Sequence, residues 1–112
     1  MPLLIVQVHL KRAPALDLNA VLTLFTNAAE LADAELEITE GEEDGPFLNC
    51  GFRTKDPGRL WEILQGQVFW ERVIGPSLAM SSIVVCQGNR GWDDYLLLHH
   101  YDRTETLDTL RR

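Results

Sequence analysis

Three residues near the start of the chain, Pro2, His9 and Arg12, are of types that take part in acid–base chemistry. The small second residue favours removal of Met1, which would leave Pro2 as an N-terminal secondary amine. An α-amino group titrates at about 7.7–8.0, and burial lowers this pKa because a low dielectric disfavours the charged form. Pro2 is therefore a candidate general base near neutral pH. The alternative is that Pro2 only begins a strand, where its missing N–H is tolerated.

Histidines form a second set of candidates, because an imidazole titrates near neutral pH. His9 and His99 are expected at the rim of a sheet, where either can assist proton transfer or serve as a structural histidine. His99 and His100 are adjacent, and adjacent strand residues point to opposite faces, so they cannot share one metal ion. No H-x-x-x-H or C-x-x-C pattern occurs, and Cys50 and Cys86 lie in apolar runs typical of buried free thiols. The sequence therefore predicts no metal site and no cofactor.

The element that positions these residues is an apolar stretch over Leu3–Leu10, rich in branched side chains and typical of a strand. By the two-residue period, one of its faces is apolar throughout, and the other becomes polar at Gln7 and His9. This pattern predicts a central strand that helices cover on one side.

Capping residues mark the helices that follow. Asp17 precedes apolar residues at helical spacing, which predicts a helix over 18–32. Asp56-Pro57 predicts the start of a second helix, and Gly75-Pro76 predicts its end. Further strands are predicted over residues 35–40, 47–53, 82–87 and 95–101, with a glycine-rich turn over 88–93.

The resulting order, β-α-β-β-α-β-β, predicts a single α+β domain over residues 1–112. Such an order forms a two-layer sandwich with the helices on one face of a mixed sheet, as in split β-α-β folds of the ferredoxin-like type and their relatives. The chain carries a net charge of −7, and residues 13–52 hold nine carboxylates and no lysine or arginine. An acidic face disfavours nucleic-acid binding and favours either a basic protein partner or simple solvation.

Location follows from what the sequence lacks. No apolar run is long enough for a membrane span, and no signal peptide is recognised, so a cytoplasmic location without membrane partners is expected.

The start of the chain resembles the tautomerase superfamily, in particular its macrophage migration inhibitory factor type. The resemblance rests on Met1-Pro2-Leu3-Leu4-Ile5-Val6, on Arg12-Ala13 and on Asp17 before an amphipathic helix. It implies a tautomerase-like β-α-β-β-α-β subunit that is commonly trimeric, as the alternative to a ferredoxin-like arrangement. It also implies an N-terminal proline as acid and base in keto–enol chemistry, and a substrate-binding role for Arg12. An extended strand of this length separates Pro2 from Arg12 by roughly 30 Å, so one site containing both requires a second subunit or a folded-back loop.

Two functions are therefore hypothesised. In the first, the protein is a tautomerase or isomerase acting on small keto acids, with Pro2 as the catalytic residue and Arg12 and His9 binding the substrate. In the second, it is a non-catalytic, acidic protein-interaction module. A homo-oligomer is possible in either case, and the aromatic residues Phe69, Trp70 and Trp92 are candidates for the subunit contact.

Overall fold

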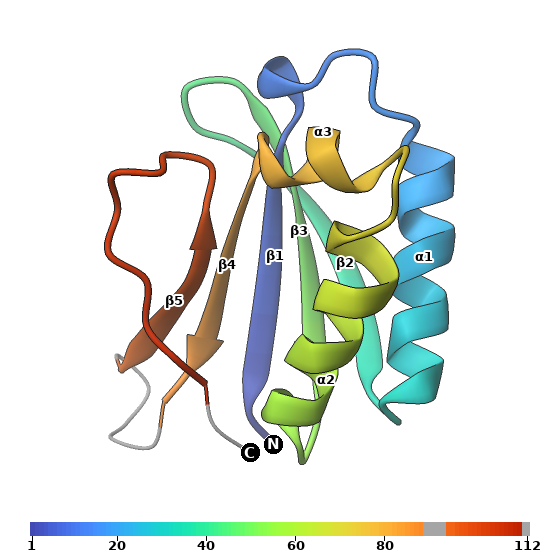
Figure 1. The fold of residues 1–112 in the computed structure, drawn as a ribbon, viewed down its shortest axis with the longest axis vertical. Helices are drawn as coiled ribbons and strands as arrows, with labels where there is room; N and C mark the ends of the chain where they lie inside the picture. The colour runs from blue at the N-terminus through green and yellow to red at the C-terminus, as the bar shows by residue number, and fades with distance from the viewer. Residues whose placement is uncertain (89–93, 111–112) are drawn as a thin grey trace.

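The computed structural model describes residues 1–88 and 94–110. Its strands form one five-stranded sheet, and its helices pack against one face of that sheet (Figure 1). The strands are β1 (Leu3–His9), β2 (Glu35–Glu42), β3 (Pro46–Arg53), β4 (Ser82–Gln87) and β5 (Tyr95–His100). The helices are α1 (Leu18–Leu31), α2 (Pro57–Leu64) and α3 (Gly75–Ala79), with a 3₁₀ turn η1 (Leu10–Arg12) and a π-helical turn η2 (Gln65–Phe69).

The strand order across the sheet is β2-β3-β1-β4-β5, so β1 is the central strand, as predicted. Every adjacent pair is antiparallel. The prediction of a mixed sheet is therefore wrong. The reason is that β2 returns through a hairpin as β3, and β3 rather than β2 pairs with β1. The connection from β1 through α1 to β2 therefore crosses the position of β3. Strands β1 and β2 run in the same direction but are not neighbours in the sheet.

The core lies between the sheet and the helices. Alternate residues of β1 are fully buried there, and β3 and β4 contribute in the same way. The rings of Phe25 from α1 and Phe52 from β3 meet edge to face, with centroids 5.7 Å apart. The other large buried side chains are Leu4, Val6, Val8, Leu60, Leu64, Val68, Leu78 and Val84. This packing confirms the α+β two-layer arrangement that the patterning predicts.

Both predicted helix starts are confirmed. The carboxylate of Asp17 accepts a hydrogen bond from the Ala20 amide at 3.1 Å, and that of Asp56 accepts one from the Arg59 amide at 3.0 Å. These bonds satisfy amides of the first turn that lack a helical partner.

The predicted end of the second helix is wrong. Helix α2 stops at Leu64, the backbone widens into the π-helical turn η2, and Gly75 and Pro76 begin α3 instead of ending a helix. Proline suits a first helical turn because its missing N–H has no helical partner there. Gly75 is required because a Cβ at this position would collide with the Phe69 carbonyl oxygen. The turn predicted over 88–93 lies almost wholly outside the described residues.

Candidate functional site

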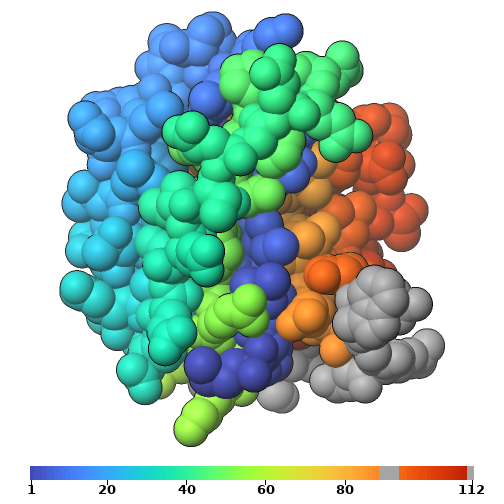
Figure 2. Space-filling model, turned by 180° about the vertical axis from the view of Figure 1, so that it is seen from behind, coloured from blue at the N-terminus to red at the C-terminus, as the bar shows by residue number. Residues whose placement is uncertain are grey.

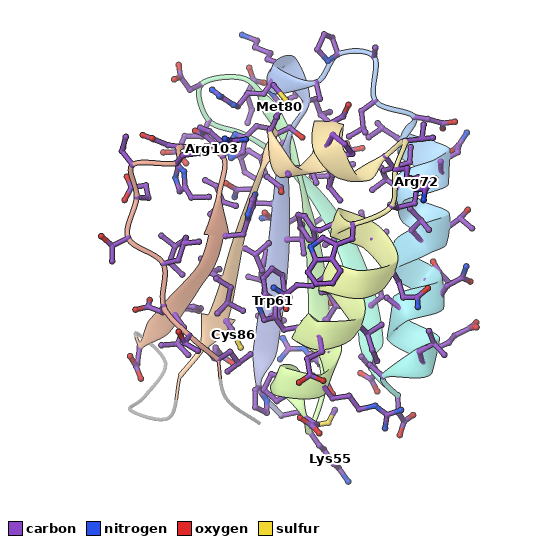
Figure 3. The ribbon with its side chains drawn as sticks, in the orientation of Figure 1. Lys55, Trp61, Arg72, Met80, Cys86 and Arg103 are labelled. Carbon is purple, nitrogen blue, oxygen red and sulfur yellow. The ribbon has the colours of Figure 1, made fainter. Side chains whose placement is uncertain are left out.

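The predicted site residues lie at opposite ends of β1. Pro2 precedes the first residue of the strand, whereas His9 ends it and Arg12 lies in the following 3₁₀ turn. Figure 3 marks the two ends, with Lys55 near the start of β1 and Met80 and Arg103 near its end. The structure therefore brings His9 and Arg12 together and separates both from Pro2.

The Pro2 end has few features of an acid–base site. With Met1 attached, the Pro2 nitrogen is a tertiary amide and carries no titratable proton. The Pro2 carbonyl accepts a hydrogen bond from the Thr54 amide at 3.2 Å, which continues the pairing of β1 with β3. A cavity of about 370 Å³ adjoins Met1, and its charged lining residues are Asp33, Glu35, Lys55, Asp56 and Arg59.

At the other end, a chain of side-chain hydrogen bonds orients His9. The Gln7 amide Nε2 donates to Asn49 Oδ1 at 3.0 Å, and Gln7 Oε1 lies 2.8 Å from His9 Nε2. Because a carboxamide oxygen can only accept, His9 Nε2 must carry the hydrogen. In the neutral ring the lone pair is then on Nδ1, the nitrogen that a base uses.

The surroundings of His9 keep its imidazole neutral. Partial burial lowers the His9 pKa from its usual value of 6.5, and the positive charges of Arg12 and His100 lower it further. The Glu43 carboxylate acts in the opposite direction and favours the imidazolium. At neutral pH, His9 is therefore an unprotonated base close to a carboxylate that stabilises its conjugate acid.

Arg12 is held beside His9 by two contacts. Its Nε donates to the Met80 carbonyl at 3.1 Å, and its guanidinium lies over the Tyr101 ring, 3.8 Å from the centroid. The Tyr101 ring in turn meets the His9 ring edge to face, with centroids 5.6 Å apart. Stacking of this kind fixes the plane of the guanidinium and leaves its terminal amino groups available to an anionic ligand.

His100 adds a further ring to the cluster. Its Nδ1 accepts a hydrogen bond from the Asp102 amide at 2.9 Å, and its ring lies 4.6 Å from that of Tyr101. The Asp102 carboxylate accepts bonds from the hydroxyl and amide of Thr104, and these bonds lower the Asp102 pKa. The turn after β5 is thus held by local hydrogen bonds, and it keeps the Tyr101 ring between Arg12 and His9.

A cavity of about 140 Å³ lies within this cluster. His9, Arg12 and Tyr101 line it on one side, and the β2–β3 turn at Glu43–Pro46 closes it on the other. Gly45 has a φ of +119°, which only glycine adopts readily, and its missing Cβ makes room for the aliphatic stem of Lys11. Lys11 also lines the cavity, so two cations and two carboxylates surround it.

His99 has a structural role and does not belong to this cluster. It pairs with Val84 and faces the helices, where it lies 2.8 Å from the Ala79 carbonyl oxygen and packs on Phe69. His100 pairs with Ile83 on the opposite face, so the prediction that the two histidines face different sides is confirmed. Among residues 1–88 and 94–110, no cluster of histidine, cysteine and carboxylate side chains is suited to holding a metal ion.

Both cysteines are buried and unbridged, as their apolar surroundings predict. Burial raises the pKa of Cys50 to about 12 and that of Cys86 to about 11, so neither thiol is a nucleophile at neutral pH. Of the aromatic residues proposed for a subunit contact, Trp70 is 76% exposed, whereas Phe69 is half-buried between Trp61 and His99. Trp92 lies outside the described residues.

Sequence reasoning missed Gln7, Asn49 and Tyr101 as parts of the site. Gln7 could have been found from its place two residues before His9, on the same face of the strand. Asn49 and Tyr101 could not, because they reach His9 only through the register of β1 with β3 and through the turn after β5.

Comparison with protein-family models, with curated proteins and with solved structures finds no match to this chain. None of the helices within the described residues is long and apolar enough to cross a bilayer.

Proposed function

We propose that the protein is a tautomerase or isomerase that moves a proton on a small keto acid, with His9 rather than Pro2 as the acid–base residue. The observation that carries the proposal is the hydrogen bond from His9 Nε2 to Gln7 Oε1, which leaves the basic lone pair on Nδ1 of a ring that lines the same cavity as Arg12. An oriented base and an adjacent cation are the two groups that enolisation requires.

The chemistry balances within this set of residues. His9 Nδ1 takes a proton from the carbon next to the substrate carbonyl, and the C–H electron pair forms the enolate double bond. Arg12 and Lys11 hold the carboxylate and the developing enolate oxygen. The imidazolium then returns its proton to the oxygen or to a carbon, and no redox partner is needed. The Glu43 carboxylate stabilises the imidazolium during this interval.

The volume of the cavity supports a small substrate. About 140 Å³ is below the range of roughly 300–1,000 Å³ for pockets that take drug-sized ligands. A keto acid of a few carbon atoms suits it, and the carboxylate of such an acid explains the two cations.

The sheet order supports the ferredoxin-like alternative over the tautomerase-like one. Strands β1 to β4 with their helices follow the split β-α-β pattern, in which β3 lies between β1 and β2. We infer a ferredoxin-like domain extended by β5 at the edge. On this inference, residues 1–17 resemble tautomerases in the class of reaction that they indicate. The base that carries out the reaction is His9 and not the N-terminal proline.

The experiment that tests the proposal is ketonisation of the enol form of oxaloacetate, a four-carbon keto acid, followed by absorbance, with wild type, His9→Gln and Pro2→Ala. Loss of general-base catalysis costs about 100- to 10,000-fold, so His9→Gln is expected to lose at least 100-fold in kcat/KM. Pro2→Ala is expected to retain activity within about threefold. Intact mass spectrometry of each sample establishes whether Met1 is present.

Two results would contradict the proposal. If Pro2→Ala abolishes activity in a protein that lacks Met1 while His9→Gln is active, the base is the N-terminal proline. If wild type has no activity above buffer, the protein is not an enzyme of this class.

A second candidate function is that of an acidic interaction module, and the exposure of β2 favours it. This edge strand and its turn carry the carboxylates of Glu35, Glu37, Glu40, Glu42 and Glu43, all exposed. A basic protein partner would bind here through charge, so its affinity should fall steeply with salt. Binding that is insensitive to salt would exclude this candidate.

A further inference from the structure

The face of the sheet opposite the helices has no covering layer within the described residues. Figure 2 shows this face directly, with β1 visible between the β2–β3 hairpin and β4. An antiparallel sheet with one face in water normally turns polar side chains outward. Here five outward positions of β1, β4 and β5 are aliphatic and only half-buried, namely Leu3, Ile5, Ile83, Val85 and Leu97, whereas Gln7 and His9 make the far end of β1 polar. A strand that is apolar on both sides is typical of a sheet with layers on both faces.

This outer face consists of two unlike halves on either side of β1. On the side of β4 and β5, Val85 and Leu97 form an apolar ridge. On the side of β3 and β2, a trough of about 370 Å³ lies at Gly51, and its lining combines Leu3 and Ile5 with polar and charged side chains of β2 and β3. The strand register puts Gly51, Val85 and Leu97 in one row across the sheet. Ile5 pairs with Gly51 on one side and with Val85 on the other, and Val85 pairs with Leu97.

We propose that this outer face is the contact surface of a homodimer, in which a two-fold axis runs along β1. Rotation about such an axis exchanges the two halves of the face, so Val85 of each copy enters the trough above the partner's Gly51. The contact is self-complementary, as a two-fold interface requires. Aligned sheets pack at about 30° to each other, so the match is best beside the axis, where Val85 and Gly51 lie.

The polar residues at the margin of the outer face are consistent with this axis. Leu3 pairs with Arg53, and the same row continues to Glu35 on one side and to Gln87 and Tyr95 on the other. The rotation places Glu35 opposite the partner's Tyr95 and Arg53 opposite the partner's Gln87. An axis across the strands would instead bring the two carboxylate-rich β2 strands together, which like-charge repulsion disfavours.

The area of the outer face is sufficient for a specific contact. Five strands about 4.8 Å apart, each contributing about six residues that rise 3.3 Å, cover roughly 500 Å². Two copies would bury about 1,000 Å², which is the lower limit for a specific interface. The face counted here includes the outward positions of Gln7 and His9, so the two His9 residues of the dimer lie near the axis. The inference goes beyond the proposed function and does not depend on it.

The test is the mass of the full-length chain in solution, measured by sedimentation over about 1–200 µM. Wild type is expected to reach the mass of a dimer. Val85→Glu buries a charge beside the axis and is expected to give a monomer. The matched control is Val73→Glu, at a position that is 78% exposed on the helical layer, and it should leave the dimer intact.

A size exchange tests the pairing itself. A Cβ at position 51 would lie 3.4 Å from the nearest atom of its own chain, which is ordinary contact, so Gly51→Val should fold. Gly51→Val and Val85→Ala are each expected to weaken dimerisation about tenfold, and the double variant should recover most of the loss. Far-UV circular dichroism checks that each variant is folded.

Three outcomes would overturn the inference. These are a wild type that is monomeric at 200 µM, a dimer that both Val85→Glu and Gly51→Val leave unchanged, and a dimer that Val73→Glu dissociates.

Discussion

The two ends of β1 differ in how they hold their polar groups. At the start of the strand, Pro2 offers the molecule only a backbone carbonyl, which Thr54 already occupies. At the end of the strand, His9 belongs to a chain of hydrogen bonds that determines which of its nitrogens carries the proton. The difference teaches that an apolar strand alone does not make a residue reactive. What distinguishes the two ends is orientation by neighbouring side chains and a nearby charge.

After His9→Gln, the largest effect is expected from Arg12→Ala. If the His9 end is the active one, this change removes the cation that stabilises the enolate, and kcat/KM should fall about 100-fold. Arg59→Ala is the matched control, because Arg59 is the arginine that lines the cavity next to Met1. Equal losses from the two variants would mean that the two ends cannot be told apart. A larger loss from Arg59→Ala would move the site to the Pro2 end.

Gly45→Ala should destabilise the protein at the His9 end. The residue has a φ of +119°, and the added methyl group would meet the Lys11 stem, so a cost of about 1–3 kcal/mol in the free energy of unfolding is expected. Gly51 lies nearer the other end of β3, its φ is not positive, and an added methyl group would make only ordinary contacts. Gly51→Ala should therefore lower the free energy of unfolding by less than Gly45→Ala. Urea unfolding of the two variants measures the difference. The expectation fails if Gly51→Ala proves to be the more damaging change.

Asn49→Ala tests whether the hydrogen-bond chain orients His9. Without Asn49 Oδ1 the Gln7 carboxamide can rotate, so the His9 tautomer is no longer fixed, and kcat should fall by about tenfold, the effect of one lost hydrogen bond. Because Asn49 positions a base and does not contact substrate, KM should change little, and the pH profile of kcat should shift. The role is excluded if KM rises while kcat and the pH profile stay as in wild type.

The smallest effect is the dependence of stability on pH. Because the folded state lowers the His9 pKa below 6.5, the unfolded chain binds more protons as the pH falls through this value. The free energy of unfolding should therefore decrease from pH 7.5 to pH 5.5, and His9→Gln should reduce this decrease. Thermal unfolding at several pH values measures it. An identical pH dependence in wild type and His9→Gln would show that the imidazole is not perturbed.

Much of the local structure could be predicted because it depends on neighbours in the sequence. Asp17 and Asp56-Pro57 mark helix starts through bonds within one turn, and the two-residue period of β1 identifies its buried face. The proximity of His9 to Arg12 follows from their sequence separation, because only two residues lie between them.

The pairing of the strands, the full set of site residues and the start of α3 could not be predicted, because they depend on contacts between distant parts of the chain. The pairing of β1 with β3 rather than with β2 decides whether the sheet is mixed or antiparallel, and no single segment contains that choice. The same pairing brings Asn49 next to Gln7, and the turn after β5 brings Tyr101 to Arg12. Gly75 begins α3 because of its contact with Phe69, which the dipeptide Gly-Pro does not reveal.

The most direct test of which end of β1 is functional is a titration of ¹⁵N-labelled protein with oxaloacetate, followed through the amide resonances of the protein. We expect the largest shifts at Lys11, Arg12, Gly45 and Tyr101, around the cavity beside His9. Shifts confined to Ala34, Thr54 and Lys55 would contradict the account, because they would place the ligand at the start of the strand.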